Sequence, residues 1–394
     1  MKFNKWTVGL AAVGVVSLAS AARAEEKASS VMTALSSTTL SGYVDTSAQW
    51  NFGTGNARLP DYKFGGSDKA DGFNLDVIQL RLEKPLDEAE WAAGYRVDLW
   101  AGPDANTLGT HSTLATGSSD FAIRQAYVAL RMPFGNGIDW KVGVFDSIIG
   151  YESVESGNNP NYTRSFGHSI EPQTHTGVLA SYRFNDMVSV SGGIADTIGK
   201  TINGRATYAD TDVPAESKKT YMASVAITAP DSWGFMSGST WYAGVVNGFD
   251  DSYSDTATSW YIGGTLATPV TGLRLGASFD YLDVHIPGET WTIAGYASYQ
   301  ATEKLSLHLR GEYLRDRGEQ KFFVDTAGDA TNPDRALALT ATAQYDLWKN
   351  VISRLELRWD HSLSGQKTWG GVTTDTEPSR RNEWLLAANI IYKF

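Results

Sequence analysis

The side chains of this sequence that could do chemistry are charged groups set at every second position of short apolar segments. The clearest run is Arg354, Glu356, Arg358 and Asp360, with a leucine or a tryptophan between each two. Alternate positions share one face of a β-strand, so these four charges would stand side by side. Because charges taken out of water need partners or a hydrated space, we interpret such faces as the wall of a water-filled passage.

Other segments repeat this arrangement along the chain. Positive and negative side chains at the predicted inward positions are nearly balanced, which favours a general hydrophilic pore over a strongly ion-selective one. The alternative is that these charges pair across the interior and plug it. The predicted pore-lining residues are Arg81, Arg96, Asp98, Lys141, Arg183, Arg274, Asp280, His308, Arg310, Glu312, Arg354, Glu356, Arg358 and Asp360.

The segment 148–171 is the predicted constriction of this passage. If it folds inward, its carboxylates face wall arginines such as Arg81, Arg96 and Arg183, and the two sets of charges create a transverse field. The charged residues of the segment, which are the constriction candidates, are Glu152, Glu155, Arg164 and Glu171.

Patterns typical of catalysis or metal binding are missing from the sequence. There is no G-x-S-x-G, H-E-x-x-H or P-loop motif, and the six histidines are scattered without ligand spacing. With no cysteine, disulfide scaffolds, thiolate metal sites and cysteine nucleophiles are excluded. We therefore expect no enzyme, no cofactor and no dedicated metal site. Two acidic groups are interpreted as solvated loops rather than weak calcium sites: Asp250, Asp251 and Asp255, and Asp325, Asp329 and Asp334.

Segments with a period of two must position the charged residues. The last segment places Trp384, Ile390, Tyr392 and Phe394 on one face of a predicted strand, as alternation requires. We count sixteen such segments: 38–52, 72–84, 90–101, 119–132, 138–147, 172–184, 187–197, 218–229, 237–248, 257–268, 272–284, 290–301, 304–315, 335–347, 350–362 and 382–394.

The connections between these segments alternate between long and short. Long ones such as 53–71 follow odd-numbered segments, and short ones such as 133–137 and 185–186 follow even-numbered ones. On the long side, 285–289 is the one connection that stays short. This asymmetry is typical of a membrane-spanning barrel. We predict an all-β fold, a transmembrane antiparallel up-and-down β-barrel of about sixteen strands (about 14–18) with short periplasmic turns and long extracellular loops.

Two stretches depart from regular alternation. Near Val77 and Ile78 the apolar positions change from odd to even, which predicts a β-bulge. Residues 119–132 fit neither phase, so the pattern assigns Arg124 to no face.

The first residues of the chain are predicted to be an export signal. Lys2 and Lys5 precede an apolar run from Trp6 to Leu18, and Ala22-Arg23-Ala24 forms an A-x-A cleavage site, as signal peptides do. The run is shorter than the ~17–25 residues of a membrane-spanning helix. The expected organisation is a signal peptide (1–24) cleaved near Ala24, a short periplasmic lead (25–37) and one transmembrane β-barrel (38–394).

Two stretches of the chain carry a resemblance to a known family. They are Ser41-Gly-Tyr-Val-Asp-Thr-Ser-Ala-Gln-Trp-Asn-Phe-Gly53 and Thr174-His-Thr-Gly-Val-Leu-Ala-Ser-Tyr-Arg-Phe184. Both stretches resemble the OmpL-like β-barrel porins of the Gram-negative outer membrane. The resemblance of the chain to this family covers essentially the whole mature chain. The resemblance implies an outer-membrane barrel with passive transport, and it carries no established substrate or functional residues. Phe394 resembles the terminal aromatic residue that serves as an assembly signal for the barrel-assembly machinery.

These observations favour an outer-membrane porin that lets small hydrophilic solutes and ions diffuse passively. The expected partners are outer-membrane lipid, the barrel-assembly machinery, small hydrophilic solutes and, by analogy with general porins, two further copies in a homotrimer. Nucleic acid is not expected, because the net charge is −11. The main alternative is a non-conducting or plugged barrel that acts as a scaffold, receptor or adhesin through its long loops. A barrel enzyme and a soluble exported β protein are further alternatives.

Overall fold

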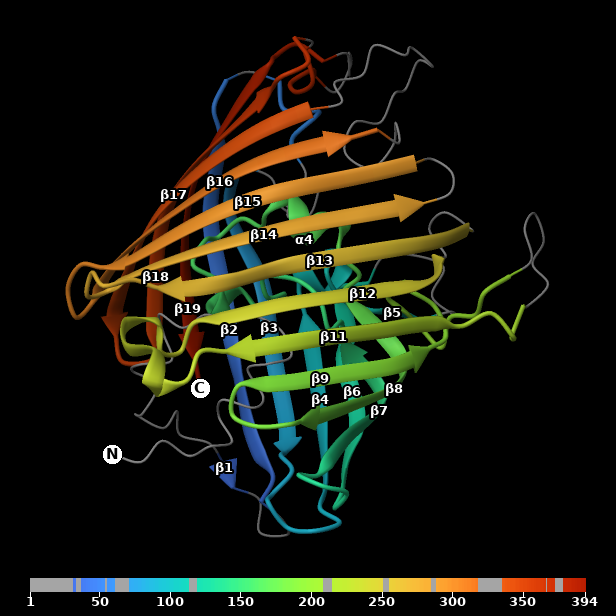
Figure 1. The fold of residues 1–394 in the computed structure, drawn as a ribbon. Helices are drawn as coiled ribbons and strands as arrows, with labels where there is room; N and C mark the ends of the chain where they lie inside the picture. Colours follow the sequence, from blue (N-terminus) through green and yellow to red (C-terminus); the bar gives the residue numbers. More distant parts are fainter. Residues whose placement is uncertain are drawn as a thin grey trace.

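The computed structural model shows a closed barrel of sixteen antiparallel strands (Figure 1). Successive barrel strands pair with one another, and β19 pairs with β2 to close the ring. The predicted fold class is therefore confirmed. The barrel strands are β2 (Thr39–Asn51), β3 (Gly72–Lys84), β4 (Ala93–Ala101), β6 (Phe121–Met132), β7 (Ile138–Asp146), β8 (Thr174–Arg183), β9 (Val188–Ala195), β11 (Thr220–Thr228), β12 (Thr240–Asp250), β13 (Asp255–Ala267), β14 (Leu273–Val284), β15 (Gly288–Gln300), β16 (Leu305–Asp316), β17 (Arg335–Trp348), β18 (Val351–Ser362) and β19 (Asn382–Lys393).

Smaller elements lie in the connections and near the N-terminus. They are β1 (Val31–Met32), α3 (Pro103–Thr107), β5 (His111–Ser112), η1 (Ser156–Asn158), α4 (Phe166–Ile170), β10 (Thr201–Ile202) and η2 (Asp231–Met236). Among the helices that the structure describes, none is long and apolar enough to cross a membrane.

The structure describes most of the chain from residue 31 onward. The predicted export signal lies outside the described residues, as do most of the predicted lead and Asp251, Asp325, Asp329 and Asp334 of the two acidic groups. The described ranges are 31–32, 37–53, 55–60, 71–112, 119–207, 215–250, 255–284, 288–317, 335–365, 367–372 and 378–394.

The barrel strands have an apolar outer face and, as the alternation predicts, most carry polar side chains on the inner face. The inner face of β11 and β12 also carries Met222 and Val246, which belong to a buried apolar cluster. In β18 the side chains of Leu355 and Leu357 are exposed on the outside, whereas those of Glu356 and Arg358 are buried inside. A shift of one residue in register would exchange the two faces. At about 2–4 kcal/mol for each arginine near the middle of a bilayer, such a shift is strongly disfavoured.

Two β-bulges place consecutive side chains inside the barrel. In β3 the pairing with β2 passes from Val77 to Leu75, so Asp76 is the extra residue, and the predicted bulge near Val77 is confirmed. In β6 Arg124 is the extra residue in the same way. Its buried side chain forms an ion pair with Asp146 at 2.8 Å. The bulge explains why regular alternation assigns Arg124 to no face.

The connections follow the predicted alternation and give the barrel two different ends, a short-turn end and a long-loop end. One detail of the prediction is wrong. Because β12 extends to Asp250 and β13 begins at Asp255, this connection on the long-loop end has four residues and is nearly as short as the three-residue connection after β14. The sequence pattern ends the first strand too early and begins the second too late, because the pairs Phe249–Thr256 and Asp250–Asp255 continue the ladder beyond the last clearly alternating residue.

Candidate channel constriction

The connection between β7 and β8, residues 147–173, lies inside the barrel, and we name it the inner loop. Its helix α4 packs against β14, β15 and β16, and Figure 1 shows this helix within the ring of strands. All residues from 161 to 170 are buried. At Gly167 a Cβ atom would collide with the carboxylate of Asp280 on the inner wall, so a larger residue would fit there only if the Asp280 side chain shifted. The inner loop therefore fills part of the space that the strands enclose.

Side chains near the start of the inner loop alternate between two environments. Glu152, Val154 and Ser156 are buried, while Ser153 and Glu155 keep part of their surface exposed. The loop thus turns one face to the wall that holds it and another to the open space of the barrel.

Arg354 of β18 holds the inner loop by its backbone. Its guanidinium group donates hydrogen bonds to the carbonyl oxygens of Ser156, Asn159 and Asn161 at distances of 2.8, 3.0 and 2.8 Å. A guanidinium offers five N–H donors in a fixed fork. One side chain therefore satisfies three buried carbonyl groups, each of which needs a partner away from water.

Two further arginines join the loop to the wall through buried contacts. Arg310 of β16 forms an ion pair with Glu152 at 2.8 Å and donates to the carbonyl oxygen of Thr163 at 2.8 Å. Arg358 of β18 donates to the carbonyl oxygen of Arg164 at 2.7 Å. Neither of these two wall side chains has exposed surface. Since removing one partner leaves the other charge buried and uncompensated, these contacts fix the position of the loop.

Glu356 of β18 completes this attachment as an acceptor. Its carboxylate receives the backbone N–H groups of Tyr162 and Thr163 at 2.5 and 3.0 Å and the Thr163 hydroxyl at 2.6 Å. Apolar packing adds to these bonds, because Tyr162 belongs to a buried cluster with Leu385 and Ile391 of β19. The middle of the inner loop is thus fixed to the wall formed by β16, β18 and β19.

Glu155 connects the inner loop to the wall on β3 and β4. It forms ion pairs with Arg81 and, at 3.1 Å, with Arg96, and both arginines also pair with Asp98, at 2.8 and 2.7 Å. The arginine side chains are 18% exposed and that of Glu155 is 15% exposed, so this four-charge cluster reaches the open space. Burial favours protonation of Glu155, but the charges of Arg81 and Arg96 outweigh it and hold the pKa of this carboxyl below its usual range. Glu155 is therefore ionised at neutral pH.

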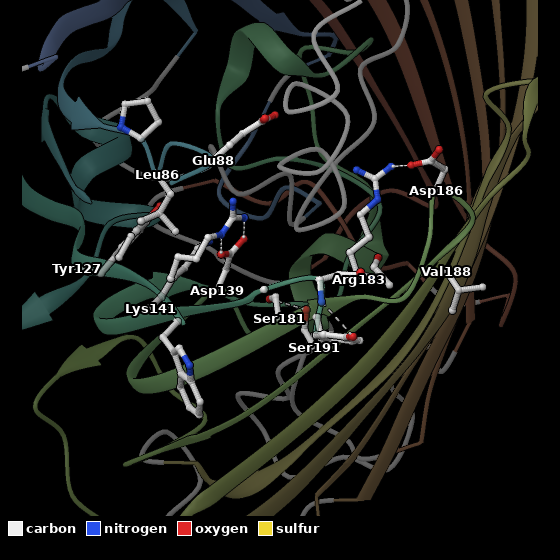
Figure 2. Close-up of a pocket in the computed structure, with 18 of the residues that line it drawn as sticks. Leu86, Glu88, Tyr127, Asp139, Lys141, Ser181, Arg183, Asp186, Val188 and Ser191 are labelled. Carbon is white, nitrogen blue, oxygen red and sulfur yellow. Dashed lines mark hydrogen bonds and ion pairs between the residues drawn. The ribbon is translucent and has the colours of Figure 1, made fainter. Parts of the chain in front are cut away.

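A cavity of about 470 Å³ lies at the short-turn end, within the part of the barrel formed by β3 to β11 (Figure 2). Its wall carries Lys141, whose Nζ atom lies 5.0 Å from the centre of the Tyr127 ring. Arg131 and Asp139 form an ion pair at 2.7 Å beside it. Arg183 also lines the cavity. Charged and aromatic side chains therefore surround this space.

The predicted pore-lining residues all lie on inner faces and divide into two groups. The first group keeps exposed surface and consists of Arg81, Arg96, Lys141, Arg183 and Arg274. The second group is buried, in most cases through contacts with the inner loop or with neighbouring charges, and consists of Asp98, Asp280, His308, Arg310, Glu312, Arg354, Glu356, Arg358 and Asp360.

The constriction candidates also differ in position. Of the four, Glu155 reaches the open space most directly, whereas Glu152, Arg164 and Glu171 are buried. The sequence predicts that Arg183 faces the loop carboxylates, but in the structure it does not. It lies at the short-turn end and forms an ion pair with Asp186 at 3.0 Å, because a period of two fixes the face of a residue and not its height on the wall.

Glu171→Gln is expected to reduce the loss of stability at alkaline pH. Burial and then the charge of Asp280 raise the pKa of Glu171 well above its usual range, and the two side chains share a hydrogen bond. A raised folded-state pKa means that this contribution to stability is complete below the unfolded pKa near 4.5 and is lost as the pH rises through the folded pKa. Glutamine keeps a donor and cannot ionise.

The measurement is the thermal unfolding midpoint of both proteins at several pH values between about 5 and 10. The midpoint of the variant should fall less steeply with rising pH than that of the wild type. Equal slopes would show that the Glu171 carboxyl does not hold its proton in the folded barrel.

Comparisons with known proteins agree with this architecture. A model of the family described as "Putative beta-barrel porin-2, OmpL-like" matches residues 37–394. No curated protein sequence matches the chain. Among solved structures, the chain is similar to the outer membrane channel DcaP of Acinetobacter baumannii (12% identity, 91% of this chain and 97% of that chain covered, TM-score 0.57) and to OmpF of Salmonella typhi (14%, 91% and 97%, 0.58). A third is OmpT of Vibrio cholerae in a trimer form (11%, 91% and 99%, 0.54). At these identities the likeness shows the fold.

Proposed function

Because the chain belongs to the family of OmpL-like β-barrel porins, we propose that small hydrophilic solutes and ions cross it between the inner loop and the wall of β3 to β9. The protein is a passive diffusion channel of the Gram-negative outer membrane. In this proposal the short turns face the periplasm and the long loops face outward. The proposal assigns no catalytic step to the chain.

The observation that carries this route is the partly exposed charge cluster around Glu155. The loop contacts of Arg310, Arg354 and Arg358 fill the interior on the side of β16 to β18. On the opposite side of the cluster, Arg96 pairs in the strand ladder with Glu83 and Tyr127, and both of those residues line the cavity at the short-turn end. Polar side chains thus continue from the loop into the cavity, through the partly exposed Glu83 and the buried Tyr127.

Single-channel conductance of the refolded mature chain in a planar bilayer tests the proposal. Discrete, stable steps with mild ion preference are expected, because the cluster holds two arginines and two carboxylates. Silence from a protein whose folding is shown by heat-modifiable gel mobility would overturn the transport route and leave a plugged barrel.

Glu155→Gln is expected to shift the ion preference toward anions by about twofold in permeability ratio. The substitution removes the loop charge that neutralises Arg81 and Arg96, and it keeps the shape of the side chain. The reversal potential under a potassium chloride gradient measures the shift. Glu90→Gln, in the exposed turn between β3 and β4, is the matched control, and identical reversal potentials for the two variants would contradict the assignment of Glu155.

The proposal includes the partners expected from the sequence. We propose assembly as a homotrimer in outer-membrane lipid, in line with the trimer form of the Vibrio cholerae neighbour, and export by the signal in residues 1–24. Phe394, whose backbone N–H and carbonyl groups both bond to Gly42 at 3.0 Å, is proposed as the residue that the barrel-assembly machinery recognises.

A further inference from the structure

The cavity at the short-turn end is lined by charged side chains, and four of them form two ion pairs. Arg131 donates hydrogen bonds to both carboxylate oxygens of Asp139 at 2.7 Å. Arg183 pairs with Asp186 at 3.0 Å (Figure 2). Because these four groups bind each other, a solute in the cavity meets the charged side chains that lie outside the two pairs.

Glu83 of β3 and Lys141 of β7 line this cavity and carry opposite charges that do not form an ion pair. The Lys141 ammonium lies over the Tyr127 ring. Within the part of the chain that the structure describes, neither this ammonium nor the Glu83 carboxylate has a hydrogen bond or an ion pair. The Glu83 carboxylate acts electrostatically on both Lys141 and the Tyr127 phenol. The two charges therefore lie near each other, yet farther apart than the members of an ion pair.

Two further carboxylates act on the charge of Lys141, and each of them is bound to an arginine. Asp139 pairs with Arg131, and Asp146 pairs with Arg124 at 2.8 Å. These carboxylates balance the charge of the ammonium without occupying its N–H groups. Since a lysine ammonium has three such donors, Lys141 can bind an anionic group although the wall around it is close to neutral.

An apolar surface adjoins the two charges. Leu86, in the turn after β3, packs against a buried cluster that includes Tyr127 and Ala129, and all three residues line the cavity. Figure 2 shows Leu86 and Tyr127 on the same side of it. The volume of about 470 Å³ is within the ~300–1,000 Å³ that is usual for small-molecule sites. The cavity thus offers a cation, an anion and an apolar surface to one small solute.

We propose that this cavity binds zwitterionic α-amino acids with an apolar side chain as they pass through the channel. Lys141 binds the α-carboxylate, Glu83 binds the α-ammonium group, and the side chain of the solute packs against Leu86 and Tyr127. The two charges of an α-amino acid are held close together on one carbon atom, so they fit between two wall charges that do not touch. The inference rests on the proposed function, because it names a class of solute for that route.

Saturation-transfer NMR of the folded mature chain in detergent micelles tests this site without requiring transport. The probes are leucine, isocaproate, which is leucine without its ammonium group, and isoamylamine, which is leucine without its carboxylate. We expect the wild type to bind leucine about tenfold more tightly than either analogue, because each analogue leaves one wall charge unmatched. Glycine has both charges and no side chain, and it should bind several-fold more weakly than leucine.

One variant for each wall charge separates the two contacts. Lys141→Gln should bind leucine no more tightly than isoamylamine, while it still prefers leucine to isocaproate. Glu83→Gln should show the reverse pattern. The controls are Lys304→Gln and Glu90→Gln, which change exposed turn residues outside the cavity and should keep the preferences of the wild type. Heat-modifiable gel mobility shows that each variant is folded.

Each outcome bears on the proposal. Equal affinity of the wild type for leucine and either analogue would overturn it, as would loss of both preferences in a single variant. Equal binding of glycine and leucine would overturn the apolar contact. Conductance steps from a channel without these preferences would overturn the amino-acid site and leave the solute route standing. Silent bilayers together with intact preferences would overturn the route and leave the binding site.

Discussion

Excising residues 152–163 of the inner loop, with a short glycine–serine linker in their place, is expected to raise single-channel conductance about threefold. These residues carry the side chains, backbone N–H groups and carbonyl groups that form hydrogen bonds or ion pairs with Arg310, Arg354 and Glu356. Without them the interior beside β16 to β18 opens to water, and the passage is no longer confined to the side of β3 to β9. The charges of those strands then line the lumen, as their inward positions predict.

The measurement is conductance in planar bilayers, with folding checked by heat-modifiable gel mobility. A shortened η2 turn (Asp231–Met236), outside the barrel interior at the short-turn end, is the control and should leave the conductance of the channel unchanged. A folded loop-deletion variant with wild-type conductance would show that the inner loop does not limit the passage.

Arg310→Met is expected to lower the free energy of unfolding by about 3–5 kcal/mol. The substitution removes the cation that pairs with the buried Glu152 carboxylate at 2.8 Å. It also removes the nearer of two cations from Glu312, at 3.2 Å, and leaves that carboxylate only Arg358 at 3.6 Å. The donor to the Thr163 carbonyl is lost as well. Methionine fills much of the volume, so the loss comes from charge and hydrogen bonding rather than from a cavity.

Equilibrium unfolding in urea, from the folded state in detergent micelles, measures this effect. Arg183→Met is the matched control, because Arg183 also faces the interior but forms its ion pair with the exposed Asp186 in water. Such exposed pairs contribute about 0–1 kcal/mol. If the two variants unfold at the same urea concentration, the Arg310 cluster does not fix the inner loop. Rapid fluctuations of the Arg310→Met channel current are expected as well, since the loop loses one of its attachments.

The barrel was predictable from the sequence because one physical constraint acts on every strand. Lipid on one face and water or polar groups on the other force a period of two, which is visible in runs such as Leu355 to Asp360. The two departures from the pattern were also informative. Near Val77 the change of phase marks a bulge, and the irregular stretch around Arg124 contains a second bulge whose extra residue the pattern could not place.

The site was less predictable, because alternation gives the face of each residue and not its neighbours. The sequence identifies Arg310 and Arg354 as inward residues and the inner loop as the constriction candidate. It does not indicate that these arginines bind loop carbonyl groups, since backbone acceptors leave no trace in residue types. The buried position of Arg164 and the contact of Tyr162 with Glu356 likewise depend on how the loop folds, for which the single sequence carries no periodic signal.

The attachments of the inner loop join parts of the chain that are far apart in sequence. The bond from Arg354 to the Asn159 carbonyl spans 195 residues, so the loop is complete in the chain long before the strands that hold it. During assembly the bonds of the inner loop to Arg310 and Arg354 therefore form only when β16 and β18 join the sheet, and closing so long a segment is entropically slow. A partly assembled barrel is then wider inside and more open to proteases at this loop than the finished channel, and attachment of the loop marks the completion of folding.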